Sequence, residues 1–164
     1  RYLEELGLSG ESIIVEITEG LLLNVDDEVI QKLLWLRDRG IQVAIDDFGI
    51  GFASLKYLQK FPVSIIKIDR SFVKHINQSH DHKKLVESII LLGKNLNKDI
   101  IAEGVEDLEH LYVLYTQNCY KYQGYLFSKP ITLKDLEILL IDKNLFANLT
   151  QPSKLKSKQP PQMN

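Results

Sequence analysis

The chain has 164 residues, of which 45% are hydrophobic and 26% are charged, and its formal net charge is −2. This is the composition of a globular domain with one sizeable core, and the near-neutral charge argues against nucleic-acid binding and against a polybasic membrane anchor. The single cysteine, Cys119, excludes an internal disulfide and is compatible with a reducing compartment. The chain opens at Arg1 without a signal-peptide pattern, and we expect it to be a cytoplasmic part of a longer protein that could itself be membrane-anchored.

Short apolar runs typical of β-strands alternate along the chain with longer segments of helical periodicity. The expected strands cover, in chain order, 13–17, 42–46, 64–68, 99–103 and 122–127. The expected helices cover about 27–39, 54–59, 82–96 and 108–117, and a last one begins at 133. In the first of these helices, Trp35 and the neighbouring leucines are expected to form the stripe that packs on the core.

Consecutive strand–helix units without hairpin turns predict parallel strands joined by right-handed crossovers. The strands are nearly continuous apolar runs, as expected when both faces of the sheet are covered. This α/β pattern fits either an open doubly wound sheet or a (β/α)8 barrel. The barrel is favoured because polar residues lie in or directly after strand after strand, where a barrel gathers its chemistry at one mouth: Glu16, Asp46, Asp47, Lys67, Asp69, Glu103 and Gln123.

A full barrel needs roughly 250 residues. We therefore expect an incomplete TIM barrel over residues 1–146, with about five of the eight strand–helix units. Residues 147–164 are rich in lysine, glutamine and proline, and are expected to form a disordered polar tail.

Carboxylates gathered at neighbouring strand ends repel each other, and such a cluster usually needs a cation. Oxygen ligands select magnesium, manganese or calcium over zinc. The adjacent pair Asp46 and Asp47 is the strongest candidate, because a turn directly after the strand could bring both side chains to the mouth. Two metal ions held there could support phosphodiester cleavage, with Lys67 stabilising the attacking water or the developing negative charge.

Five segments carry a resemblance to a known family: VEITEG at 15–20, DDFGIGFASL at 46–55, IKIDRSFV at 66–73, AEGVED at 102–107 and QGYLFSKPI at 123–131. In this order they resemble EAL-domain cyclic-di-GMP phosphodiesterases. The resemblance implies the last five units of a (β/α)8 barrel, and hydrolysis of cyclic di-GMP to linear pGpG with Mg²⁺ or Mn²⁺. It also implies a homodimer formed through the loop after Asp47, and sensory or diguanylate-cyclase domains upstream in a bacterial signalling protein.

The same resemblance implies a role for each matching residue. Metal ligands would be Glu16, Asp46, Asp47 and Glu103, with Asp46 shared between two ions. Lys67 would position the hydrolytic water. The loop after Asp47 would be anchored by Glu19, and Glu106 and Gln123 would support the mouth.

The sequence also departs from the family pattern. The Glu-Ala-Leu signature and the strand bearing an asparagine ligand are absent from these residues, so we expect little catalysis from this chain by itself. Hydroxyl-bearing residues common in the loop are replaced by Ile50, Phe52 and Ala53, and Asn118 and Tyr120 replace residues common before QGY. An alternative is therefore a non-catalytic EAL module that senses cyclic di-GMP or mediates protein association.

Overall fold

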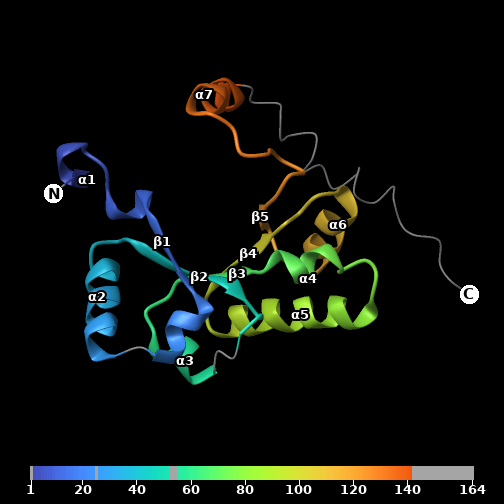
Figure 1. Ribbon diagram of the computed structural model, residues 1–164, viewed down its shortest axis with the longest axis horizontal. Coiled ribbons are helices and arrows are strands. Elements are labelled where there is room, and N and C mark those ends of the chain that lie inside the picture. Colours follow the sequence, from blue (N-terminus) through green and yellow to red (C-terminus); the bar gives the residue numbers. More distant parts are fainter. Residues whose placement is uncertain (1, 25, 52–54, 142–164) are drawn as a thin grey trace, which may run out of the picture.

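Five parallel strands form one sheet whose spatial order follows the chain (Figure 1). The computed structural model describes residues 2–24, 26–51 and 55–141. The strands are β1 (Ile14–Thr18), β2 (Gln42–Phe48), β3 (Ile65–Ile68), β4 (Asp99–Glu103) and β5 (Lys121–Gln123), and each pairs with the next. A doubly wound sheet reverses its strand order at a switch point, whereas a (β/α)8 barrel keeps sequence neighbours adjacent. The predicted TIM-barrel type of fold is thus confirmed.

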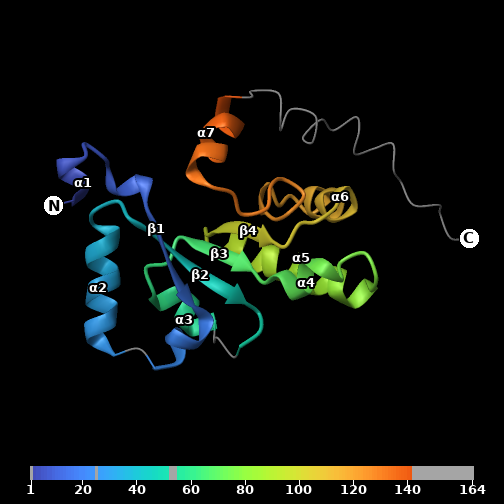
Figure 2. The same cartoon turned by 45° about the horizontal axis from the view of Figure 1, so that its top comes forward.

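The helices alternate with the strands and pack against the sheet. The bounds of the elements outside the sheet are α1 (Tyr2–Glu5), η1 (Gly10–Ser12), η2 (Glu19–Asn24), α2 (Asp27–Arg37), α3 (Leu55–Lys60), α4 (Arg70–Lys74), α5 (His80–Asn95), α6 (Leu108–Thr116) and α7 (Leu133–Ile141). Aspartates cap three of them, each accepting from a backbone amide: Asp26 from Val29 at 2.9 Å, Asp69 from Ser71 at 2.8 Å and Asp107 from His110 at 2.7 Å. Figure 2 shows α7 standing apart from the helices that cover the sheet, and none of its residues is buried.

The core lies between the sheet and its helices. Alternate residues of β3 and β4, including Ile66, Ile68 and Ala102, belong to this core. On α5, a Cβ at Gly93 would lie 2.1 Å from the Ile100 side chain, so only glycine lets this helix approach the sheet so closely. Because strand side chains alternate between faces, Lys67 and Glu103 project from the opposite face.

The observed elements differ from the expected ones in three main respects. Strand β2 was expected to end at Asp46 but runs on to Phe48, so Asp47 also lies inside the strand. Strand β5 ends at Gln123, well short of 127. The short helix α4 was not predicted, because its five residues carry no helical periodicity to detect. The predicted tail at 147–164 lies outside the described residues.

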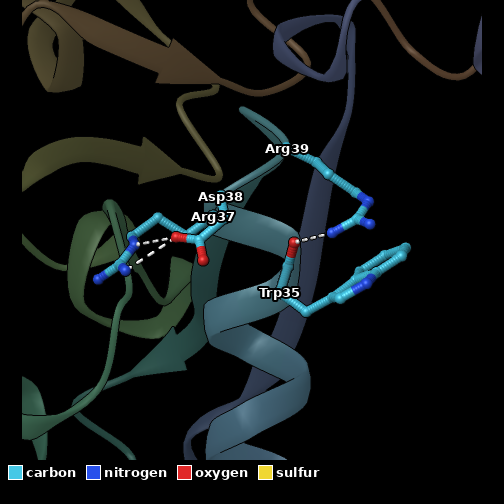
Figure 3. A network of polar contacts seen from close by, with 4 residues as sticks. All are labelled: Trp35, Arg37, Asp38 and Arg39. Atoms are coloured by element: carbon cyan, nitrogen blue, oxygen red, sulfur yellow. Dashed lines mark hydrogen bonds and ion pairs between the residues drawn. The ribbon is translucent and has the colours of Figure 1, made fainter.

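The interpretation of Trp35 as part of the core stripe was wrong. Its side chain is 52% exposed, and the Arg39 guanidinium carbon lies 3.6 Å from the centre of its ring (Figure 3). Leu33 is the buried residue of this helix. A step of two residues rotates the direction around a helix by about 200°, so Trp35 points away from the face that buries Leu33.

Among the described residues, no helix combines the length and hydrophobicity needed to span a bilayer.

Candidate metal and phosphodiester site

The carboxyl ends of the central strands meet around the ammonium group of Lys67. This residue lies on β3, where every residue is buried, and its own exposure is 4%. Its Nζ lies 2.8 Å from a Glu16 carboxylate oxygen, 2.9 Å from one of Asp46 and 2.8 Å from one of Glu103. Residues from four adjacent strands therefore converge on one point, as a barrel mouth requires.

Exposure of the three carboxylates falls from the first strand toward the fourth. The side chain of Glu16 on β1 is 47% exposed, that of Asp46 on β2 is 26% exposed, and that of Glu103 on β4 is 15% exposed. The ion pairs of Lys67 are thus increasingly shielded from water toward β4, where Coulomb interactions are stronger.

A β-bulge brings the two aspartates to the same place. The pairing register of β2 against β3 shifts between Ile45 and Phe48, so that Asp46 and Asp47 together lie opposite Lys67. Ile45 and Phe48 are both core residues, and Asp47 adopts a φ of 54°. A left-handed residue inside a strand is uncommon, and here it turns the second carboxylate toward the mouth instead of into the core.

The electrostatics of the mouth reflect burial and crowding. Burial by itself lowers the pKa of Lys67, but hydrogen bonds to Glu103, Glu16 and Asp46 outweigh it, and the pKa lies above its ordinary value. Burial raises the pKa of Glu103, and the neighbouring carboxylates raise it further against the effect of Lys67. The carboxyl group of Glu103 therefore holds a proton more readily than a free one.

Asp47 and Asp69 form a second pair of carboxylates beside the first. Burial raises the pKa of Asp47, and the carboxylates of Asp46 and Asp69 raise it further. Asp69 is 5% exposed and accepts from the Ser71 amide at 2.8 Å, at the start of α4. The sequence placed Asp69 at a strand end but gave it no role; its position two residues after Lys67 is the signal that could have shown it to border the site.

Glu19 holds the loop that follows β2. It is 4% exposed, and one of its carboxylate oxygens accepts from the amides of Gly49 at 2.8 Å and Gly51 at 3.1 Å. The loop residue Ile50, between these glycines, is 62% exposed. Phe52 and Ala53, the other departures in this loop, lie outside the described residues.

A cavity of about 450 Å³ opens beside the carboxylates. Glu103, Glu106 and Gln123 line it, together with Arg70 and Tyr125. The structure thus places the expected supporting residues Glu106 and Gln123 in the same cavity wall as Glu103.

The residues present fit a divalent cation. One oxygen from each of Asp46, Asp47 and Glu103 lies within 4.8 Å of the other two. A set of carboxylate oxygens without histidine or cysteine suits Mg²⁺ or Mn²⁺. Glu16, the fourth expected ligand, is not among these three; it lies on β1 and forms an ion pair with Lys67.

Comparison with known proteins identifies one family along most of the chain. The family model of the EAL domain matches residues 1–130. Cyclic di-GMP phosphodiesterase NbdA of Pseudomonas aeruginosa is 39% identical over 138 residues, which is 84% of this chain and 18% of that protein. The chain spans about a fifth of the length of the curated relatives that it matches.

Solved structures are similar to this chain in both fold and sequence. The EAL domain of Mycobacterium smegmatis DcpA superposes with a TM-score of 0.79 at 38% identity, over 85% of this chain and 62% of that one. A complex of Klebsiella pneumoniae BlrP1 with manganese and cyclic di-GMP superposes with a TM-score of 0.72 at 34% identity, over 78% of this chain and 33% of that one. With its sequential parallel sheet and its acidic mouth, this chain belongs to the EAL-domain family.

Proposed function

We propose that this chain carries the catalytic carboxylates and lysine of a cyclic-di-GMP phosphodiesterase, which hydrolyses cyclic di-GMP to linear pGpG in the bacterial cytoplasm. The observation that supports this most is the convergence of Glu16, Asp46 and Glu103 on Lys67 from separate strands. Relatives that are named cyclic di-GMP phosphodiesterases support the substrate.

In this proposal Glu16, Asp46, Asp47 and Glu103 would hold two Mg²⁺ or Mn²⁺ ions, and Asp46 would be a ligand of both. When bound, the ions supply Lewis-acid activation of a water molecule and neutralise charge on the leaving oxygen. The water oxygen bonds to phosphorus while the bond from phosphorus to the 3′ oxygen breaks, and in the net reaction one water proton ends on that 3′ oxygen.

The chain's own residues orient this reaction. Lys67 is fixed by its ion pairs at the centre of the mouth, where its ammonium can donate a hydrogen bond to the attacking oxygen and stabilise negative charge on the phosphate. The cavity beside Glu103 offers room for a nucleotide, and Tyr125 can stack on a base there. Glu19 keeps the loop after Asp47 near the carboxylates through Gly49 and Gly51.

A non-catalytic role is the second candidate, and Ile50 favours it. In this candidate the isoleucine, 62% exposed on the loop held by Glu19, would contact a second copy of the domain. In that case the module would bind cyclic di-GMP without hydrolysing the nucleotide, or would serve only to form a dimer. Both candidates place the chain in a longer signalling protein with sensory or cyclase domains.

Hydrolysis distinguishes the two candidates. The full chain, alone and within a complete EAL domain, is incubated with cyclic di-GMP and manganese, and pGpG is measured by chromatography. We expect product from the complete domain, its loss in Asp46→Asn, and little product from the chain alone. Nucleotide binding without product in the complete domain would support the sensor; retention of full activity in Asp46→Asn would contradict the proposed site.

A further inference from the structure

Lys67 makes more contacts than a single catalytic hydrogen bond requires. A lysine ammonium carries three protons, and here its Nζ forms ion pairs at 2.8–2.9 Å with one oxygen of each of three carboxylates. The three acceptors come from β1, β2 and β4, so this one side chain joins three strands other than its own.

The carboxylates alone would not stay together. Like charges brought close on a part-buried surface repel, and removing one partner of a buried ion pair leaves the other charges uncompensated. Asp46 and Glu103, at 26% and 15% side-chain exposure, cannot turn fully into water to escape this repulsion. The ammonium of Lys67 supplies the opposite charge at the point where they meet.

We propose that Lys67 acts as an internal counter-cation: in the metal-free protein it holds Glu16, Asp46 and Glu103 in the converged arrangement, and it competes with divalent ions for their oxygens. This inference deepens the proposed function and rests on its metal site. It assigns Lys67 a positioning role in the metal-free fold, separate from its contact with the attacking oxygen.

The competition has two consequences. The fold depends less on bound metal than it would without the lysine, because the carboxylates are already neutralised in part. The divalent ions also bind less tightly than they would to the same carboxylates without the lysine. When the ammonium is removed and the aliphatic stem is kept, the fold should depend more on bound metal, and the divalent ions should bind more tightly.

Thermal unfolding of the full chain in EDTA and in manganese tests this, with Lys67→Met and the matched control Lys98→Met. Lys98 is a half-buried lysine at the other end of the sheet, where its Nζ donates to the Val63 carbonyl oxygen. In EDTA we expect Lys67→Met to unfold roughly 6–15 °C below wild type and Lys98→Met within about 3 °C of it. Manganese should raise the midpoint of Lys67→Met by about twice the shift seen in wild type or in Lys98→Met.

Equal manganese shifts in all three proteins, or a Lys67→Met chain as stable in EDTA as wild type, would overturn the inference. If Lys67→Met fails to fold in both buffers, the double variant Lys67→Met with Glu103→Gln decides. Removing one carboxylate charge relieves the repulsion, so the double variant should fold; a double variant that also fails contradicts the role of charge.

The outcome is separate from that of the hydrolysis assay. The expected midpoint shifts without pGpG formation in the complete domain would keep the counter-cation and reject the phosphodiesterase. Hydrolysis by the complete domain without those shifts would reject the counter-cation alone.

Discussion

A lysine lies at each end of the sheet, and the pKa of the two is shifted in opposite directions. At the carboxyl end, three carboxylates hold Lys67 and raise its pKa above the ordinary value. At the amino end, Lys98 donates to the Val63 carbonyl, and burial lowers its pKa. Burial alone therefore pushes a lysine toward its neutral form, and only acidic residues from neighbouring strands reverse this.

This contrast in the surroundings of Lys67 and Lys98 distinguishes the candidate site at the carboxyl end of the sheet from the structural surface at its amino end. In (β/α)8 enzymes the carboxyl ends of the strands carry chemistry, and the opposite end contributes stability. Paired substitutions, one at each end of the sheet, test whether that division holds in this chain.

The largest contrast is expected within strand β4, which has an acidic residue at each end. Glu103→Gln removes a proposed metal ligand and a Lys67 partner, and should lower the hydrolysis rate of the complete domain at least about 100-fold. Asp99→Asn removes an exposed ion pair with Lys121 of 2.8 Å, which contributes little, and should leave the rate within about twofold. Rates of pGpG formation measure both; equal losses would erase the distinction between the two ends.

A smaller effect is expected in the loop held by Glu19. A Cβ at Gly51 would lie 2.9 Å from the Glu19 carboxylate, so Gly51→Ala displaces that carboxylate from the loop amides. We expect hydrolysis by the complete domain to fall roughly 10-fold, because two hydrogen bonds that position the loop weaken.

Gly20→Ala is the matched control for this loop. A Cβ at Gly20 meets no atom within 4 Å, so the same change should leave hydrolysis unaltered. The loop would have no part in the reaction if the Gly51 variant matched the Gly20 variant.

Labelling of the single cysteine tests, without a mutation, whether the amino end of the sheet is buried. Cys119, directly before β5, is 2% exposed, and burial raises the pKa of its thiol to about 11. At pH 8 the folded chain should therefore react with a thiol-specific reagent at least about 100-fold more slowly than the chain in denaturant. Because the raised pKa disfavours the thiolate, the protection should weaken as the pH rises toward 11. Rapid labelling of the folded chain at pH 8 would show that this end of the sheet is open.

The sequence predicted the sheet because its strands are largely apolar runs; in 65–68, for example, three of the four residues are isoleucine and all four are buried. It also predicted which polar residues lie at the strand ends, since that follows from chain order alone. It could not show the bulge at Asp46 and Asp47, because the backbone angle of Asp47 depends on pairing with β3 and leaves no trace in hydrophobic periodicity.

The sequence pattern also could not predict in which direction a side chain points or which residues it contacts. Trp35 is exposed and covered on one side by Arg39, although an aromatic residue among leucines indicates a core position (Figure 3). That Lys67 bonds three carboxylates at once depends on the spacing of four strands in space. Such contacts need coordinates, because no segment of the chain contains all the partners.

Binding of Mn²⁺, followed by electron paramagnetic resonance, tests most directly whether the acidic mouth holds divalent ions. We expect the full chain to bind Mn²⁺, Asp46→Asn to bind it at least about tenfold more weakly, and Asp99→Asn to bind it as wild type does. Identical Mn²⁺ affinity in all three proteins would contradict the account, because the carboxylates gathered around Lys67 would then not be the ligands.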